Sequence, residues 1–348
     1  MRAELSSSQE AVKKEPAPPP AVIALNEAEF ARFFPGEARA RLEAMLPGLR
    51  AWPSELGGEA WAEWLRAEKI EIVVSGWVTP RLPEEPGALR AVCHVAGSVR
   101  GLVPRSLLER GVVVSNWGDL PGRTVAEAAL HLVLCALRRT PHYVKLVAND
   151  SRAWSALPHG TRTLFGRRVG IHGFGSVARA LVPLLRPFGV EIAAYSEGVS
   201  AEDYAAFGVR HADSLDVLFS NSEILIEAEG LTPATAGSVD ERRLRLLPEG
   251  AVFVNVARGG LVADEAALAR VAAERGLRLG LDVYREEPLP PESPLRGLDE
   301  AFLQPHLAGP TDDEALRAGE RLMENLARVL AGQPPVHVVS LAAYDRAT

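Results

Sequence analysis

Three side chains in the second half of the sequence could together act on a carboxylic acid. Arg258 follows the apolar run at residues 252–256, Glu287 lies in a Tyr-Arg-Glu-Glu-Pro run, and His306 ends a short apolar run. An arginine presents a planar, permanently charged fork that matches a carboxylate. A histidine beside a carboxylate can act as an oriented general acid and base. The pattern predicts that Arg258 holds a substrate carboxylate and polarises the carbonyl, while His306, oriented by Glu287, exchanges a proton.

Each of these residues has a plainer interpretation when it is taken singly. An arginine at a strand end usually makes a surface ion pair, a Glu-Glu-Pro run is usually a solvated turn, and a lone histidine usually has a structural hydrogen bond. In the chain, however, all three residues come after a segment whose pattern is typical of dinucleotide-binding proteins. Beside a nicotinamide, they predict hydride transfer to a 2-keto acid.

The dinucleotide pattern occupies residues 168–197. An apolar run predicts a buried strand, a glycine turn follows, and apolar residues at three- and four-residue steps predict a helix from Val177 to Phe188. The free N–H groups at the start of such a helix favour a pyrophosphate, which a glycine backbone can approach closely. The turn residues expected against the cofactor are Gly173, Phe174, Gly175, Ser176 and Val177.

The second strand of this unit, Val190 to Tyr195, ends where a group that reads the adenosine ribose is expected. Ser196 can bond a ribose hydroxyl but carries no charge, whereas the carboxylate of Glu197 would repel a 2′-phosphate. The next basic residue is Arg210. We therefore expect NAD as the cofactor, with a preference weaker than an aspartate would give, so that NADP remains possible.

Composition bounds the other classes of function. The chain has 348 residues, enough for two domains, with 47% hydrophobic and 24% charged residues and a net charge of -7. This acidic balance argues against a nucleic-acid partner, and the apolar run at residues 128–137 is too short for a membrane span. The two cysteines, Cys93 and Cys135, predict buried thiols in a reducing compartment, which we take as the cytoplasm. No metal site is predicted.

Apolar runs alternating with helical patterns predict an α/β fold with doubly wound parallel sheets. Residues 1–20, rich in Ser, Glu, Lys and Pro, predict a disordered tail without a secretory signal. A long helical pattern at residues 124–139 is apolar on more than one face and needs two partners, and residues 116–122 before it predict a hinge. Strands are predicted at residues 22–25, 70–75, 89–95, 111–115, 223–226, 250–256 and 277–283, and a helix at 36–46.

The chain closely resembles the D-isomer-specific 2-hydroxyacid dehydrogenases, of the formate and glycerate dehydrogenase type, over nearly all of residues 21–348. The matching pieces are the glycine turn, Val125-Ala126-Glu127, Leu231-Thr232-Pro233 with Thr235, Asn255 to Gly260 with Asp264-Glu265 and Leu268, Asp282-Val283 with Glu287-Pro288, and Pro305-His306 with Gly309.

This resemblance implies a Rossmann NAD-binding domain inserted in a flavodoxin-like substrate domain. The substrate domain would comprise residues 21–118 and a return segment at 308–348, and the NAD-binding domain residues 119–307. The resemblance implies a homodimer joined largely through the cofactor domains. Arg258, Glu287 and His306 would be catalytic, Thr232, Ala257 and Asp282 would lie against the cofactor, and Ala96, Gly97, Ser98, Arg100 and Arg258 would receive the substrate.

Two departures from the family pattern affect substrate and cofactor choice. Gly97-Ser98-Val99-Arg100 places a second positive group near the substrate, and Ala228-Glu229-Gly230 makes another loop acidic. One alternative is a glyoxylate or hydroxypyruvate reductase that prefers NADPH. Another, from a different class, is a nucleotide-binding corepressor-like protein, which the acidic charge and the lack of a recognisable partner motif disfavour.

Overall fold

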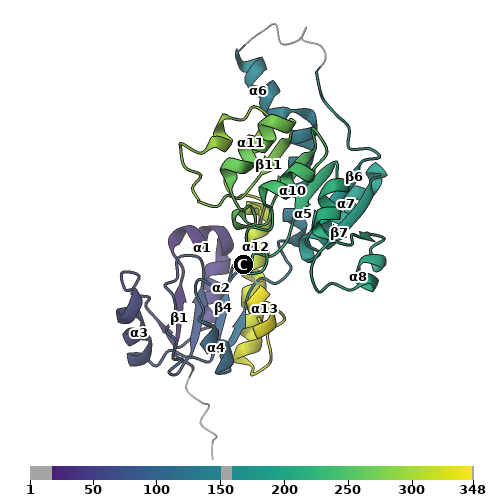
Figure 1. Cartoon of the computed structure of the whole chain (residues 1–348). Helices are drawn as coiled ribbons and strands as arrows, with labels where there is room; N and C mark the ends of the chain where they lie inside the picture. The colour runs from purple at the N-terminus through teal and green to yellow at the C-terminus, as the bar shows by residue number, and fades with distance from the viewer. Residues whose placement is uncertain (1–17, 150–158, 347–348) are drawn as a thin grey trace, which may run out of the picture.

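The computed structural model describes residues 18–149 and 159–346 of the chain (Figure 1). The predicted tail therefore lies, as far as residue 17, outside the described residues. Pro20 already belongs to the folded body, because its carbonyl oxygen accepts hydrogen bonds from the backbone of Glu71 at 2.8 Å and of Ile72 at 3.3 Å.

The first sheet has five parallel strands in the order β2-β1-β3-β4-β5. Its strands are β1 (Ala21–Ala24), β2 (Leu49–Arg50), β3 (Ile72–Ser75), β4 (Ala91–His94) and β5 (Val113–Ser115). Apolar strands buried on both faces need helices on both sides. One side is covered by α1 (Glu27–Phe33), α2 (Glu37–Ala44) and α12 (Asp312–Leu330), and the other by α3 (Gly58–Ala67), α4 (Arg105–Glu109) and α13 (Leu341–Arg346).

The second sheet has seven parallel strands in the order β12-β11-β10-β9-β6-β7-β8. Its strands are β6 (Arg168–His172), β7 (Glu191–Tyr195), β8 (Arg210–His211), β9 (Ile224–Glu227), β10 (Val252–Asn255), β11 (Arg278–Leu281) and β12 (Ala301–Leu303). The strand order reverses between β6 and β9, which opens a crevice beyond their carboxyl ends. The prediction of an α/β fold with two doubly wound domains, one of them Rossmann-like, is confirmed.

Helices also cover both faces of the second sheet. The long helix predicted at residues 124–139 is α5 (Gly122–Arg138), whose apolar surface packs on α7 and on strands β10 and β11 of the same chain. The face of the sheet that α5 covers also carries α7 (Ser176–Leu185), the 3-10 turn η2 (Arg186–Phe188) and α8 (Ala201–Ala206). The other side carries α9 (Leu215–Asn221), α10 (Glu241–Leu246), α11 (Glu265–Arg275) and the 3-10 turns η3 (Gly259–Leu261) and η4 (Pro294–Gly297).

The chain crosses between the two sheets twice. It enters the second sheet through α5 and returns through α12, which packs against α1 and β4, so the yellow C-terminal helices lie with the purple and blue first domain in Figure 1. Both cysteines are free and buried. Across residues 18–149 and 159–346, no helix is both long and apolar enough to span a membrane.

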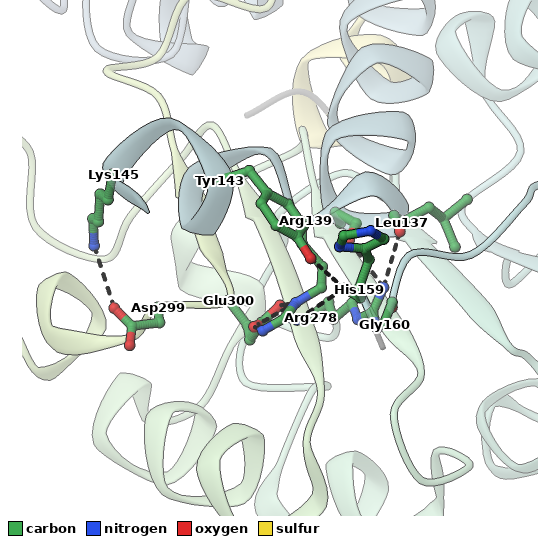
Figure 2. A network of polar contacts seen from close by, with 10 residues as sticks. Leu137, Arg139, Tyr143, Lys145, His159, Gly160, Arg278, Asp299 and Glu300 are labelled. Carbon is green, nitrogen blue, oxygen red and sulfur yellow. Dashed lines mark hydrogen bonds and ion pairs between the residues drawn. The ribbon is translucent and has the colours of Figure 1, made fainter. Parts of the chain in front are cut away.

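A polar network fixes the end of α5 and the start of α6 (Thr140–Asn149) against β11 and β12 (Figure 2). Arg139 donates to both carboxylate oxygens of Glu300, and its Nη1 donates to the carbonyl of His159 at 3.0 Å. The buried guanidinium of Arg278 donates to the carbonyl of Leu137 at 2.9 Å and to that of Gly160. The carbonyl of Leu137, at the end of α5, also accepts the N–H of Arg162 at 2.9 Å, so two bonds satisfy this helix end.

Candidate active site

A cleft of about 580 Å³ lies between the two domains, beyond the carboxyl ends of both sets of strands. In open α/β sheets this edge is where ligands bind. The predicted site residues that line it come from both domains: Gly97 and Ser98 from the first, and Val177, Ala257, Arg258, Asp282 and His306 from the second.

His306 and Glu287 form a hydrogen-bonded pair at the rim of this cleft. The Nδ1 atom of His306 lies 2.8 Å from Oε2 of Glu287, and both side chains are partly exposed. The other carboxylate oxygen, Oε1, accepts the backbone N–H of Tyr284 at 3.0 Å. Because the carboxylate is fixed at both oxygens, it orients the imidazole ring and leaves Nε2 for a substrate.

Asp282 holds the backbone of the loop that carries His306. It is fully buried, and its carbonyl oxygen accepts the N–H of His306 at 2.8 Å. Its carboxylate oxygens accept the N–H groups of Leu307 at 2.7 Å and Ala308 at 3.0 Å. Asp282 lines the cleft, where a cofactor contact is predicted. Its hydrogen bonds hold the His306 loop in place.

The loop after β10 presents Arg258. The buried side chain of Asn255 donates from Nδ2 to the carbonyl of Arg258 at 3.0 Å and accepts the N–H of Ala257 at 3.0 Å. Gly259 has no room for a side chain, because a Cβ there would overlap the backbone of Tyr284. Burial lowers the pKa of Arg258, and the negative charges of Glu287 and Asp282 oppose that shift. An arginine in such a place stays charged and gains from an anionic ligand.

The first domain supplies the opposite wall. Asn116 donates from Nδ2 to the carbonyl of Gly97 at 2.6 Å, and Trp117 donates its backbone N–H to Ala96 at 3.2 Å. A Cβ on Gly97 would lie 2.7 Å from the Trp117 ring nitrogen, so the glycine lets the loop lie flat against the indole. The sequence predicts the Gly97 loop as a substrate contact but gives no signal for Trp117.

Arg100 and Thr232 line a second hollow, and Arg258 lines both this hollow and the main cleft. This adjoining open hollow of about 780 Å³ is also lined by Arg285. Arg100 and Arg258, which come from different domains, thus line one hollow, and Thr232 lines this hollow rather than the main cleft. Arg100 also lies over the ring of Tyr344, 5.9 Å from its centroid.

The glycine turn lies at the other end of the cleft. Gly173 has a φ of 98°, and a Cβ there would lie 2.5 Å from the backbone of Ala228 and Glu229, so this glycine is required by the fold. A Cβ on Gly175 would meet nothing within 4 Å, and no side chain caps α7, which begins at Ser176. The open backbone and the free N–H groups fit a pyrophosphate. Phe174 is buried, with its ring packed against that of Tyr204.

The residues expected at the ribose lie beside this turn. The hydroxyl of Ser196 donates to Oε2 of Glu229 at 2.6 Å, whereas Glu197 is exposed. Directly below, the buried side chains of His172 and Glu227 are paired, with Nδ1 and Oε2 2.7 Å apart. The sequence shows that Glu229 makes its loop acidic but does not indicate that it lies beside Ser196.

Comparison with known proteins gives one family. Residues 130–308 match the model of the D-isomer specific 2-hydroxyacid dehydrogenase, NAD binding domain. The chain is 28% identical over 281 residues to D-3-phosphoglycerate dehydrogenase of Methanocaldococcus jannaschii, covering 80% of this chain and 53% of that protein. It is 29% identical over 256 residues to glyoxylate reductase of Korarchaeum cryptofilum, covering 72% of this chain and 76% of that protein.

A solved structure shares the fold. The apo form of Rhodotorula graminis D-mandelate dehydrogenase superposes with a TM-score of 0.79 at 22% identity, covering 92% of this chain and 98% of that one. The chain spans about half the length of the D-3-phosphoglycerate dehydrogenases that it matches, 53% of one and 42% of another.

Proposed function

The chain belongs to the D-isomer specific 2-hydroxyacid dehydrogenase family, and we infer that it interconverts a small D-2-hydroxy acid and its 2-keto acid with NAD(H). One observation carries this proposal: the His306–Glu287 pair, 2.8 Å apart, faces the same cleft as Arg258. A proton donor and a carboxylate-binding fork beside a nicotinamide are what reduction of a 2-keto acid requires.

Each side chain of the cleft has its own role in this reaction. Arg258 holds the substrate carboxylate with its planar fork and polarises the adjacent carbonyl, while the amides around Gly97 and Ser98 bind the carboxylate from the opposite wall. Bound NADH supplies the hydride. His306 donates the proton held at Nε2 to the developing alkoxide, and Glu287, bonded to Nδ1, stabilises the ring in its charged state. In the oxidative direction His306 takes the proton back.

The cofactor domain supports this arrangement from the other end of the cleft. The glycine turn and the uncapped start of α7 would hold the pyrophosphate, with backbone N–H groups of Ser176 and Val177 directed to it. Ala257 lines the same cleft and would pack against the cofactor. The buried Asp282 positions the His306 loop at the nicotinamide end.

The test is turnover of 2-keto acids, followed by the absorbance of NADH and of NADPH. Glyoxylate and hydroxypyruvate come first in the panel, because the chain is similar to a glyoxylate reductase over most of both proteins. We expect turnover of at least one small 2-keto acid with NADH, and its loss in His306→Ala. A chain that binds NADH but reduces none of the panel would contradict the dehydrogenase and favour the corepressor-like alternative.

A homodimer is part of the same proposal. Helix α6 buries none of its own residues, and it exposes 64% of Val144 and 57% of Val147. Apolar side chains at helical spacing on an uncovered helix are typical of an interface. Sedimentation velocity should give twice the mass of the chain, and Val147→Glu should shift the protein toward the monomer. A monomeric parent protein would contradict this part of the proposal.

A further inference from the structure

Two carboxylates flank the position that should meet the adenosine ribose. Glu197 follows Ser196 in the chain, and Glu229 reaches Ser196 from the end of β9. The two differ in their surroundings, because Glu197 is exposed to solvent whereas Glu229 lines the cleft. Which of them meets the ribose decides how the chain tells NAD from NADP.

Ser196 is held firmly in place. The buried hydroxyl of Tyr204 accepts the N–H of Ser196 at 2.8 Å and donates to the Ser196 carbonyl at 3.2 Å. The hydroxyl of Ser196 then donates to Oε2 of Glu229 at 2.6 Å. The Tyr204 hydroxyl thus fixes the backbone of Ser196, and the bond to Glu229 fixes its side chain.

Glu229 is held just as firmly. Its Oε1 accepts the N–H of Gly230 at 2.9 Å, and its backbone packs against the glycine turn, where a Cβ on Gly173 would lie 2.5 Å away. A carboxylate can accept about four hydrogen bonds. Two positions are used within the chain, so the remaining lone pairs can accept the hydroxyl groups of a ribose lying over the turn.

Two cationic side chains of this domain, His172 and Arg179, have carboxylate partners of their own. His172 and Glu227, both buried, form a pair of opposite charge. Burial lowers the pKa of His172, but the charge and hydrogen bond of Glu227 and the charge of Glu229 outweigh burial and raise it. The guanidinium of Arg179, in the first turn of α7, is already bonded to Asp203 at 3.3 Å. A phosphate beside Glu229 would therefore meet a negative charge.

We propose that Glu229, oriented by Ser196, is the carboxylate that reads the adenosine ribose and excludes a 2′-phosphate, in place of Glu197. The inference rests on the proposed position of the dinucleotide but not on the hydride transfer. It assigns cofactor choice to a residue after β9 rather than to Glu197 at the end of β7, which the sequence pattern predicts.

The test compares two nucleotides that differ only in the 2′-phosphate. Adenosine 5′-monophosphate and adenosine 2′,5′-bisphosphate are titrated calorimetrically into the parent, Glu229→Gln and, as the matched control, Glu197→Gln. Both substitutions remove one charge and keep the shape of the side chain. The parent should bind the monophosphate more tightly. In Glu229→Gln the ratio of the two dissociation constants should move toward the bisphosphate by roughly tenfold or more, and in Glu197→Gln by less than about twofold.

The outcomes separate this inference from the proposed reaction. A shift in Glu197→Gln with none in Glu229→Gln would overturn it, as would a parent that binds the bisphosphate equally well. A parent that binds neither nucleotide would overturn the position of the dinucleotide and this inference together. Selective nucleotide binding that depends on Glu229, in a protein that reduces no 2-keto acid, would leave the inference standing while the proposed reaction fails.

Discussion

The backbone N–H of His306 donates to the carbonyl oxygen of Asp282 at 2.8 Å, and the buried carboxylate of the same aspartate accepts the next two N–H groups of the chain. His306 has a φ of 56°, in the left-handed region that residues other than glycine seldom adopt. Such a conformation costs roughly 1–3 kcal/mol and persists only where the surroundings fix it. Asp282 thus stabilises the backbone conformation that places the imidazole beside Glu287.

Asp282→Asn should lower kcat by about ten- to a hundredfold, because an amide can accept at only one of its two ends and the His306 loop loses a hydrogen bond. Steady-state kinetics give kcat, and titration with NADH gives the cofactor affinity separately. Unchanged kcat in a variant that folds normally would show that the loop holds the histidine without this carboxylate.

His306→Ala should leave NADH binding intact and lower turnover by roughly a hundred- to ten-thousandfold, the usual range for a general acid and base. Glu287→Gln should give a smaller loss, because the amide can still bond Nδ1 but does not stabilise the charged ring. Near-normal turnover in His306→Ala would remove this residue from the mechanism.

Arg258→Lys should raise KM for the keto acid by about tenfold or more, because a point charge does not replace a planar fork that bonds both carboxylate oxygens. The guanidinium is also half-buried, with Nη1 donating to the carbonyl of Ala257 at 2.6 Å. The matched control is Arg285→Lys, at an exposed arginine of the adjoining hollow. Parent-like affinity for the keto acid in Arg258→Lys would argue against the carboxylate role.

The strands were predictable because buried parallel strands are short apolar runs bounded by polar residues. The predicted strand at residues 22–25 is Ala21–Ala24, and that at 111–115 is Val113–Ser115. The sequence did not indicate β8, Arg210–His211, because both residues are polar and exposed at a sheet edge. It also did not indicate α11, whose buried residues are mostly alanines and form no clear apolar stripe.

The site was predictable only in part, for a related reason. Residues at strand ends could be placed on one edge from the order of elements alone, which brought Arg258 and His306 together. Contacts across the sheet depend on its register, and the pairing of His172 with Glu227 joins residues 55 positions apart. Sequence spacing carries no information on that register, and the same holds for the bond between Ser196 and Glu229.

Two glycines of the same turn should respond differently to alanine. Gly173→Ala should prevent normal folding, because its φ is 98° and the added Cβ would lie 2.5 Å from the backbone of Ala228. Gly175→Ala should fold with a melting temperature close to the parent's, since nothing lies within 4 Å of its Cβ, yet bind NADH about tenfold or more weakly. Calorimetric unfolding and nucleotide titration measure the two effects. Unimpaired NADH binding by Gly175→Ala would place the pyrophosphate elsewhere.

The buried pair of His172 and Glu227 should affect stability. Their side chains are almost fully buried, and Oε1 of Glu227 has no hydrogen-bond partner within the described part of the chain. His172→Val alone would leave a buried carboxylate without its partner and should cost about 3–5 kcal/mol of unfolding free energy. The double variant with Glu227→Leu should recover that loss or exceed the parent by about 1–4 kcal/mol, because well-packed apolar residues avoid the desolvation of both charges.

The pH dependence of the same pair follows from the raised pKa of His172. A histidine whose pKa is higher in the folded state stabilises the fold fully below its unfolded pKa, about 6.5, and loses that contribution as the pH rises through the folded value. As the pH rises above about 6.5, the parent should therefore lose stability relative to the double variant. Melting temperatures of both proteins from pH 6 to 9 measure the difference. A constant gap between the two across that range would mean that His172 is uncharged in the folded protein.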